Sequence, residues 1–429
     1  MKKILHIAPH LGGGAGKAIS GMITCLTEYN NTLLLLEEPI ELKHVNKCID
    51  SGIKVIITTD YVEINNLINN SDAVIINWWG HPLMVTVLNI FSKVKTRLMI
   101  WSHINGLSYP YLTYEFINMF DEIAFTSKCS YENPTWNSEQ VLKIKSKSSL
   151  VLGFGDFNPE KINYKNNYCI KQMYKVGYIG TLSFSKINTL FPEICKDIKS
   201  KIKCTEFILC GNYDNEFYSS IKQDKYIFES TVFTGFISDV NEKLVEFDLF
   251  CYPLAEENFA TTENSILEAM AAALPIIVMD NPAERSIISH DVTGLIAKNS
   301  SEVSYYACEL YKNRSRAAKL GRNAREFILS TYKQEDNTKV FKDCIQRLFF
   351  YSKSNHDFES LTGKSAGDFF IYFSGKDSVK FMDVINGKEL TINPIYYNEN
   401  KGSPFHYLKY YPDDKLLRLI VDKISKSFK

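Results

Sequence analysis

The sequence predicts an α/β protein with two Rossmann-like domains and a C-terminal α+β extension. Three observations carry this prediction: short β-branched runs alternate with helical stretches, the alternation stops at a polar segment over residues 158–167, and it resumes at residue 175. Such alternation is typical of a parallel sheet with helices on both faces. The chain has 429 residues, whereas one core stops growing near about 250–300 residues.

We expect the first domain to span residues 1–165. Its expected strands are residues 4–8, 32–36, 54–57, 73–77, 98–101, 123–126 and 150–152. Helical patterns separate several of these strands, so a parallel sheet is the simplest arrangement.

We expect the second domain to span residues 172–335. Its expected strands are residues 175–180, 206–211, 232–235, 249–252 and 275–279, and its expected helices include 263–273, 302–311 and 317–330. A connecting helix over residues 336–350 then leads into the extension.

The extension, residues 351–429, is rich in Tyr, Phe, Asn and Lys and contains two β-like runs, 368–373 and 389–395. After Pro412 comes an Asp that can cap a helix. Residues 415–429 then show the pattern of a basic amphipathic helix. We favour a helix packed on the protein body, and contact with a membrane surface or a partner is the alternative.

Charge and cysteine content exclude several classes of function. Lys+Arg and Asp+Glu both number 49, so no global field attracts nucleic acid. The 10 cysteines are scattered without a Cys-x-x-Cys pair, which indicates reduced thiols. The basic N-terminus is followed by an apolar run broken by His6 and Pro9, which predicts a strand rather than a signal peptide. We therefore expect a cytoplasmic protein that binds no nucleic acid.

A glycine-rich segment, Gly-Gly-Gly-Ala-Gly-Lys over residues 12–17, follows the first expected strand. Glycines allow close approach of a ligand, and the following helix start presents backbone N–H groups to an anion. Leu11 and Ala18 rule out a Walker loop, and Lys17 interrupts a Gly-x-Gly-x-x-Gly pattern. The segment indicates an anion-binding turn, with a plain tight turn as the alternative.

Two histidines follow expected strands, His81 and His103, and three of the four tryptophans of the chain lie beside them. Ligands of open α/β sheets bind outside the carboxyl ends of the strands. We therefore favour His103 as a substrate contact, with less weight on His81. A packed histidine is the alternative for both.

The second domain carries two further motifs. Gly180 ends its first strand and Lys186 follows, which suits a phosphate group because lysine acts as a point charge. In the longer motif, over residues 256–277, Thr261 or Thr262 is expected to cap a helix that begins near residue 263. The start of that helix would point towards a diphosphate. Glu268 lies in an apolar stretch, where ligand hydroxyls would satisfy its carboxylate.

In their order along residues 1–350, these motifs resemble the retaining family-4 glycosyltransferases, also called glycosyl transferases group 1. That family has two facing Rossmann-like domains, the GT-B fold, with a nucleotide-sugar site in the cleft between them. The most specific part is Leu-Glu-Ala-Met-Ala-Ala-Ala-Leu-Pro-Ile-Ile over residues 267–277, followed by 281–285 and 292–296.

The resemblance implies roles for individual residues. It implies that Lys186 neutralises the donor diphosphate, that His103 contacts the transferred sugar and that Glu263 orients it, so these three are the expected catalytic residues. Glu268 is expected to bind the ribose hydroxyls. The full set of expected donor-binding residues is Gly13, Gly14, Ala15, Gly16, Gly180, Thr181, Thr261, Thr262, Asn264, Ser265 and Glu268.

Two positions depart from the family pattern. Thr181 stands where the family usually has arginine, and Ala260 stands where it has its first glutamate. The diphosphate charge would then fall more heavily on Lys186 and on backbone amides.

The implied function is that of a hexosyltransferase-like enzyme, which moves a sugar with retention from a nucleoside-diphosphate sugar to a glycan or lipid-linked acceptor. The setting would be bacterial surface polysaccharide or glycoconjugate synthesis, in the cytoplasm or at the inner face of the membrane. No metal or further cofactor is expected, because the sequence has no Asp-x-Asp and no His/Cys cluster with ligand spacing. A nucleotide-sugar epimerase and a non-catalytic glycan-assembly partner that binds nucleotide sugar are the alternatives.

Overall fold

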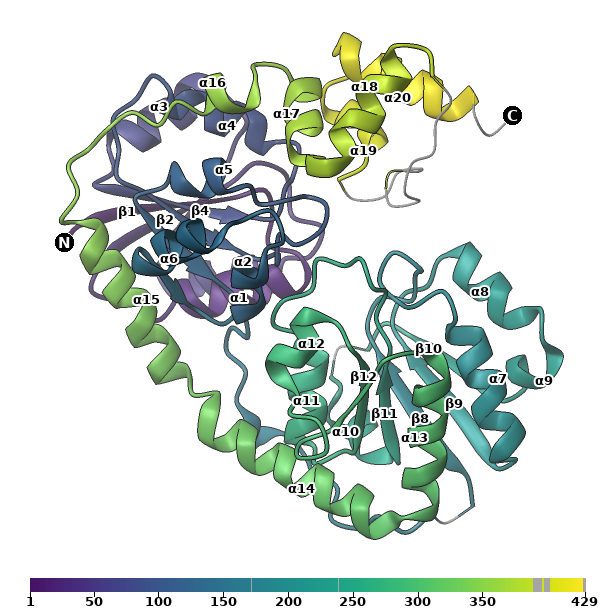
Figure 1. Cartoon of the computed structure of the whole chain (residues 1–429). Helices are drawn as coiled ribbons and strands as arrows, with labels where there is room; N and C mark the ends of the chain where they lie inside the picture. The colour runs from purple at the N-terminus through teal and green to yellow at the C-terminus, as the bar shows by residue number, and fades with distance from the viewer. Residues whose placement is uncertain (171, 238, 389–395, 397–401, 427–429) are drawn as a thin grey trace. The chain divides into compact units, whose positions relative to one another are not determined.

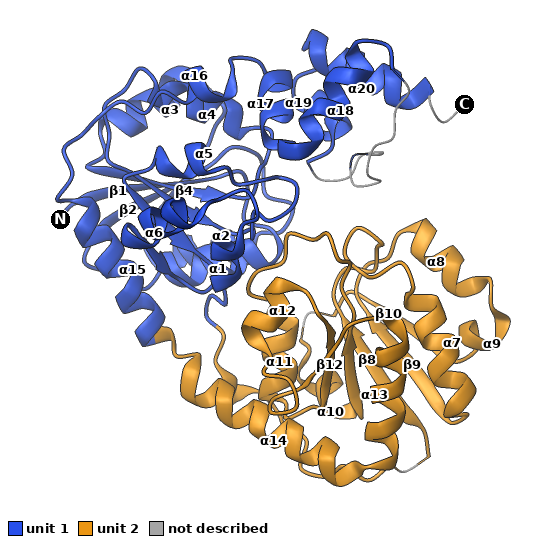
Figure 2. Cartoon of the chain, in the orientation of Figure 1, with its two compact units in different colours: residues 1–156, 335–429 blue, residues 157–334 orange. Residues whose placement is uncertain are grey.

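The computed structural model describes residues 1–429 except 171, 238, 389–395, 397–401 and 427–429 (Figure 1). The chain forms two compact units (Figure 2). Unit 1 comprises residues 1–156 and 335–429, and unit 2 comprises residues 157–334. The connecting helix and the C-terminal extension therefore belong to the same unit as the N-terminal sheet.

Unit 1 is built on a seven-stranded sheet in the order β3-β2-β1-β4-β5-β6-β7, with every neighbouring pair parallel. The strands are β1 (Lys3–Ala8), β2 (Asn30–Leu35), β3 (Lys54–Ile57), β4 (Ala73–Trp78), β5 (Leu98–Ser102), β6 (Glu122–Phe125) and β7 (Ser148–Leu150). The parallel sheet predicted for the first domain is confirmed.

Helices cover both faces of this sheet. They are α1 (Gly13–Ile23), α2 (Lys43–Asp50), α3 (Tyr61–Asn69), α4 (Met84–Phe91), α5 (Tyr114–Asn118), α6 (Ser138–Ser146) and α15 (Gln334–Leu348). Because side chains alternate along a strand, Leu5 and Ile7 of β1 join the core under α4, whereas Ile4 and Ala8 join the core under α1.

The described part of the extension is helical. Its helices are α16 (Phe358–Thr362), α17 (Ala366–Phe373), α18 (Ser378–Ile385), α19 (Pro404–Tyr410) and α20 (Lys415–Lys426). The β-like run expected at 368–373 is wrong, because Ser365 and Asp368 form a capping box that starts α17. Phe369, Phe370 and Phe373 are then buried at helical spacing. The second run, 389–395, lies outside the described residues.

Helix α20 confirms the amphipathic helix expected near the C-terminus. The Asp414 carboxylate accepts the backbone N–H groups of Leu416 and Leu417, both at 3.0 Å. Leu417 is buried, as are Ile420 and Ile424, in the core that also contains the interior of β4. Its apolar face is thus used in packing on unit 1. Among the described helices, none has the length and apolar character needed to cross a membrane.

Unit 2 contains a six-stranded parallel sheet in the order β10-β9-β8-β11-β12-β13. The strands are β8 (Tyr174–Ile179), β9 (Thr205–Cys210), β10 (Thr231–Gly235), β11 (Leu249–Tyr252), β12 (Ile276–Met279) and β13 (Leu295–Ala297). The helices are α7 (Phe191–Lys201), α8 (Asn215–Lys222), α9 (Lys225–Phe228), α10 (Asn241–Glu246), α11 (Asn264–Ala271), α12 (Pro282–Ile287), α13 (Ser300–Lys312) and α14 (Arg314–Thr331). All predicted strands are present, and β13 is additional.

Both sheets share one topological feature. In unit 1 the first strand β1 lies beside the fourth strand β4, and in unit 2 β8 lies beside β11. Chain connections run in opposite directions from such a pair, which opens a crevice at the carboxyl ends of the two strands. The loops that leave these strand pairs carry most of the predicted site residues.

Candidate active site

Lys186 and Glu263 meet at the carboxyl end of the β8–β11 pair. Lys186 lies in the loop after β8, and Glu263 is the residue immediately before α11. The Lys186 Nζ atom is 3.1 Å from Glu263 Oε2, and the Tyr252 hydroxyl at the end of β11 donates to the same oxygen at 2.7 Å. The structure thus brings together two of the predicted catalytic residues and adds Tyr252, which sequence reasoning missed.

The electrostatics of this group keep the lysine charged. Burial opposes the ammonium form, but the nearby Glu263 carboxylate outweighs it and raises the pKa of Lys186 above its ordinary value. The ammonium also lies 5.6 Å from the centre of the Tyr252 ring. Because 26% of the Lys186 side chain is exposed, a ligand anion can reach a fixed positive charge here.

A second carboxyl group, Glu284 of α12, lies buried near this pair. Asn281 donates its side-chain N–H to Glu284 Oε1 at 2.7 Å, whereas Oε2 has no hydrogen-bond partner among the described residues. Burial raises the pKa of Glu284 to about 8, and the charge of Glu263 acts in the same direction. Glu284 is therefore protonated at neutral pH and has an O–H to donate. The motif at 281–285 was noted in the sequence, but no role was assigned to this residue.

The start of α11 differs from the expectation. Neither Thr261 nor Thr262 caps the helix, because it begins at Asn264 and Glu263 occupies the capping position. The Glu263 side chain makes no capping bond because it is held by Lys186 and Tyr252 instead. The Glu263 carboxylate therefore does not cap the positive end of α11, and this leaves the backbone N–H groups there suited to an anion.

The remaining donor residues predicted in unit 2 lie around the same strand ends. Asn264, Ser265 and Glu268 are partly buried on α11. Gly180 has a φ of 153°, and a Cβ on Gly211 would come within 1.9 Å of the Gly180 carbonyl oxygen, so glycine is required for the ends of β8 and β9 to approach. Thr181 is exposed.

In unit 1, Gly13, Gly14, Ala15 and Gly16 form the first turn of α1. Gly13 has a φ of 59°, which favours glycine, and a Cβ on Gly16 would lie 2.2 Å from the Leu11 carbonyl oxygen. Gly13 and Gly14 are exposed, so the amide end of α1 is accessible to an anion.

His103 follows β5 and is a neutral side chain. Burial lowers its pKa to about 3. Asn77 uses its N–H to bond the Ile7 carbonyl, which leaves its oxygen to accept from His103 Nε2 at 3.2 Å. The ring packs 4.5 Å from Trp101, centre to centre. His103 can therefore accept a hydrogen bond at Nδ1, as from a sugar hydroxyl, but it supplies no charge.

Three side chains gather at the ends of adjacent strands in unit 1: His10 after β1, Glu37 after β2 and His81 after β4. We call them the His–Glu cluster. Their ligand atoms lie within 4.8 Å of one another, close enough to surround a metal ion. The sequence pointed to His81 but not to His10 or Glu37, although both of these residues lie just after the end of a strand.

Backbone hydrogen bonds set the protonation of this cluster. The N–H of Gly12 donates to His10 Nδ1 at 2.9 Å, and the N–H of Leu83 donates to His81 Nδ1 at 3.3 Å. An accepting Nδ1 places the ring proton on Nε2, which lies 3.8 Å (His10) or 3.6 Å (His81) from Glu37 Oε1. A metal would need the Nε2 lone pairs. The arrangement therefore favours a carboxylate surrounded by donors over a metal centre.

Comparison with known proteins gives the following matches. Residues 174–313 match the family model described as glycosyl transferases group 1. A 2-deoxystreptamine N-acetyl-D-glucosaminyltransferase of Niallia circulans is 29% identical over 168 residues, which are 37% of this chain and 41% of that protein. The amylovoran biosynthesis glycosyltransferase AmsK of Erwinia amylovora is 25% identical over 32% of this chain and 36% of its own. The matched segments thus span less than half of either relative.

Solved structures share the fold over a longer stretch. Anabaena Alr3699/HepE, solved in complex with UDP-glucose, has a TM-score of 0.65 at 14% identity and covers 81% of this chain and 100% of its own. Sucrose-phosphate synthase of Thermosynechococcus elongatus has a TM-score of 0.60 at 13% identity and covers 82% of this chain. The predicted pair of Rossmann-like domains is confirmed by these likenesses and by the two parallel sheets.

Proposed function

We propose that this chain, whose residues 174–313 match the family model described as glycosyl transferases group 1, is a glycosyltransferase. It moves a sugar from a nucleoside-diphosphate sugar to a glycan or lipid-linked acceptor in bacterial glycan synthesis. The observation that carries the proposal is the Lys186–Glu263 pair, 3.1 Å apart at the crevice of unit 2. The family match and the two glycosyltransferase relatives support the same activity.

Unit 2 holds the donor. Lys186 and the amides at the start of α11 neutralise the diphosphate, whose negative charge grows as the bond to the sugar breaks. Glu263 and Tyr252 hold the lysine in place. Glu268 binds the ribose hydroxyls, and the protonated Glu284 carboxyl, whose Oε2 has no hydrogen-bond partner among the described residues, has an O–H to offer to the bound donor.

The reaction proceeds with retention and without a metal. The bond between the anomeric carbon and the diphosphate oxygen breaks, and a bond from that carbon to the acceptor oxygen forms on the same face. The acceptor proton leaves with the diphosphate oxygen. Because Lys186 supplies the positive charge, the reaction has no need of a metal ion.

Unit 1 offers a contact for a sugar and a second anion-binding helix start. Through Nδ1 the neutral ring of His103 can accept a hydrogen bond from a sugar hydroxyl. The exposed amides of Gly13 and Gly14 approach phosphate or acceptor. The proposal requires no membrane contact through α20, because the apolar face of that helix is buried in unit 1.

A thermal-shift screen against UDP-, GDP- and dTDP-sugars tests the proposal. A donor that binds only the folded state raises the melting temperature in proportion to its affinity. We expect one class of donor to do so, and we expect Lys186→Ala to remove the shift and the transfer activity. Lys201→Ala is the matched control, because Lys201 pairs with Asp197 on the surface of α7.

The outcomes separate the alternatives. No shift with any donor, or full transfer by Lys186→Ala, overturns the proposed donor site. Donor binding without turnover would instead support a non-catalytic partner, for which Thr181 and Ala260 already provide a reason. An epimerised donor without a second product would support an epimerase.

A further inference from the structure

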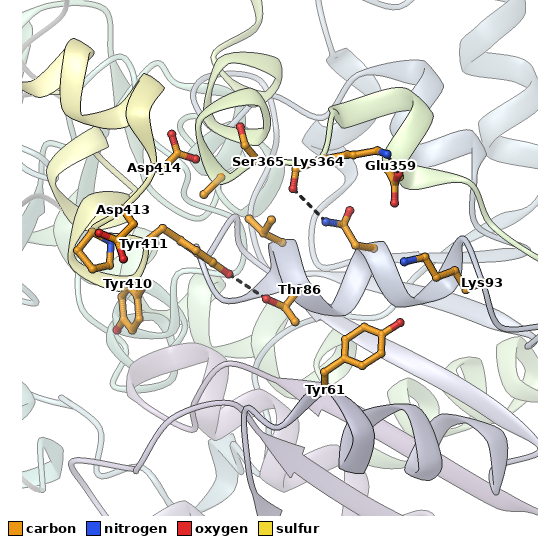
Figure 3. Close-up of a pocket in the computed structure, with 14 residues that line it drawn as sticks. Tyr61, Thr86, Lys93, Glu359, Lys364, Ser365, Tyr410, Tyr411, Asp413 and Asp414 are labelled. Carbon is orange, nitrogen blue, oxygen red and sulfur yellow. Dashed lines mark hydrogen bonds and ion pairs between the residues drawn. The ribbon is translucent and has the colours of Figure 1, made fainter.

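Unit 1 contains a cavity of about 660 Å³ that none of the predicted site residues lines (Figure 3). Its walls come from two stretches far apart in the sequence, residues 61–93 and residues 359–414. The C-terminal extension thus completes a cavity that the N-terminal sheet and its helices cannot form alone. Its volume lies within the roughly 300–1,000 Å³ typical of small-molecule sites.

One wall is a single face of α4 and the start of α3. Val85 and Asn89 are four residues apart on the same side of α4, and Lys93 lies in the turn just after the helix ends at Phe91. Tyr61, the first residue of α3, adds an aromatic ring that is 41% exposed. Figure 3 shows Tyr61 and Lys93 on this side of the cavity, across from the extension.

The opposite wall is the turn between α19 and α20, together with the segment that precedes α17. Direct bonds hold it against α4: the hydroxyls of Tyr411 and Thr86 lie 3.2 Å apart, and Asn89 donates to the Lys364 carbonyl at 3.2 Å (Figure 3). The Tyr411 hydroxyl also reaches the Pro82 carbonyl at 3.3 Å. The cavity is therefore preformed.

The lining suits a neutral, hydroxyl-rich ligand. Glu359 forms an ion pair with Lys364, and Asp413 forms one with Arg418, both at 2.8 Å. The remaining lining charges, Asp414 and Lys93, are of opposite sign, so the lining has no positive excess that would select an anion. Three tyrosines offer ring faces of the kind that the apolar face of a sugar ring packs against, and neutral Thr86 and Asn89 offer hydrogen bonds.

Tyr410 joins this cavity to the His–Glu cluster. It lines the cavity, its hydroxyl donates to Glu37 Oε2 at 2.5 Å, and its ring lies 5.2 Å from that of His81. The cluster lies at the carboxyl edge of the unit 1 sheet, the edge at which α/β folds bind ligands. One side chain thus links a sugar-sized cavity with the crevice of unit 1.

We propose that this cavity binds sugar units of an oligosaccharide, at a subsite built jointly by α4 and the C-terminal extension. The oligosaccharide is the acceptor chain, held through units that lie before the reacting sugar; this identification rests on the proposed function, whereas the binding itself does not. Tyr61 packs against a sugar ring, while Asn89, Lys93 and Asp413 bond its hydroxyls. The extension is then part of the substrate-binding machinery.

The experiment uses the full chain and an array of neutral and acidic di- to hexasaccharides, with no nucleotide present. The tightest-binding oligosaccharide is then titrated by calorimetry against variants. We expect a neutral oligosaccharide to bind, and we expect Tyr61→Ala to weaken binding by about tenfold, which is about 1.4 kcal/mol, because the variant loses the contact between the aromatic ring and the sugar. Lys93→Ala should weaken binding by a smaller factor.

The controls match the variants in place and exposure. Val62→Ala removes the next exposed side chain of α3, and Lys95→Ala removes an exposed lysine two residues beyond Lys93; neither residue lines the cavity. Both should bind as the unmodified protein does. Equal melting temperatures for all four variants show that folding is unchanged.

Absence of binding to every oligosaccharide, preference for acidic ones, or binding unaffected by Tyr61→Ala and Lys93→Ala overturns the subsite. Lys186→Ala, in the other unit, separates this result from the proposed function. If that variant binds oligosaccharide normally and keeps full transfer, the donor site is wrong while the sugar-binding cavity stands.

Discussion

The two sheets have the same strand order around their central pairs but very different side chains there. At the end of β8 and β11 lie a charged lysine, a carboxylate bonded to it and a buried protonated carboxyl group, Glu284. At the end of β1 and β4 lie neutral rings, His10 and His81, around a single carboxylate. One crevice suits an anion, and the other suits hydroxyl groups.

The difference shows that the fold supplies the place and the side chains supply the chemistry. Crossover topology puts the loops after the central strands at one edge in both units. In unit 2 these loops provide a fixed positive charge, as a diphosphate requires. In unit 1 they provide hydrogen-bond donors, acceptors and tryptophan rings, as a sugar requires.

The largest expected effect follows the loss of the Glu263 charge. Glu263→Gln keeps the size of the side chain but removes the ion pair with Lys186, so the lysine is no longer held in the position that we propose for contact with the diphosphate. We expect kcat for transfer to fall by about 100-fold, as when one preorganised electrostatic contact is lost. The affinity for the nucleoside diphosphate of the donor alone should change little, because Lys186 keeps its charge. Steady-state kinetics and calorimetry with that nucleoside diphosphate measure the two quantities.

Glu246→Gln is the matched control for this variant. Glu246 pairs with Lys243 and Lys175 on the surface of unit 2, and 38% of its side chain is exposed. It should transfer sugar at the normal rate. An unchanged kcat in Glu263→Gln would show that the pair of Lys186 and Glu263 is a structural contact. The charged residues of unit 2 would then have no catalytic role to set against the neutral residues of unit 1.

Much of the unit 2 site was predictable from the sequence. The alternation of strands and helices places the loops after β8 and β11 at one edge, so Lys186 and Glu263 had to lie near each other. The details were not predictable. A capping threonine was expected, but Glu263 takes that position because its carboxylate has partners outside the helix. The burial of Glu284 depends on how α12 packs, which one sequence does not specify.

Unit 1 was harder to predict, for two reasons. Glu37 meets His10 and His81 only because β2, β1 and β4 are neighbours, and this order is a property of the sheet rather than of any one segment. Residues 368–373 have the apolar character of a strand, but the capping box at Ser365 starts a helix there. The cavity beside α4 requires contacts between residues nearly three hundred apart, such as that between Thr86 and Tyr411.

A second expected effect, on stability rather than on the rate of transfer, concerns the buried proton of Glu284. Its pKa is about 8 in the folded protein, against an ordinary value of 4.5. Between these values the folded state holds a proton that the unfolded state has lost, so this carboxyl group makes the protein less stable as the pH rises from 4.5 to about 8. Glu284→Gln cannot ionise. Relative to the unmodified protein, we expect it to gain up to about 4 kcal/mol between pH 5 and pH 8.

Urea unfolding of the two proteins at pH 5 and at pH 8 measures this gain. Glu246→Gln serves again as the control, because its exposed carboxylate should leave the pH dependence as it is. An identical pH dependence for Glu284→Gln and the unmodified protein would show that Glu284 is ionised in the folded state. The crevice of unit 2 would then hold two carboxylates against one lysine, which would weaken its suitability for an anion.

The smallest expected effect is that of metal removal. Because Lys186 provides the positive charge in unit 2, dialysis against EDTA should leave the transfer rate unchanged, and adding back Mg²⁺, Mn²⁺ or Zn²⁺ should not raise it. The His–Glu cluster makes this a sharp test of unit 1, since backbone N–H groups donate to Nδ1 of both histidines and leave the protons on the nitrogens that a metal would need. A rate lost with EDTA and restored by one metal would contradict this protonation. His81→Ala would then decide where the metal binds. If this variant abolished metal binding, the crevice of unit 1 would be a metal centre and not a set of neutral rings, and it would differ from the lysine site of unit 2 in that way.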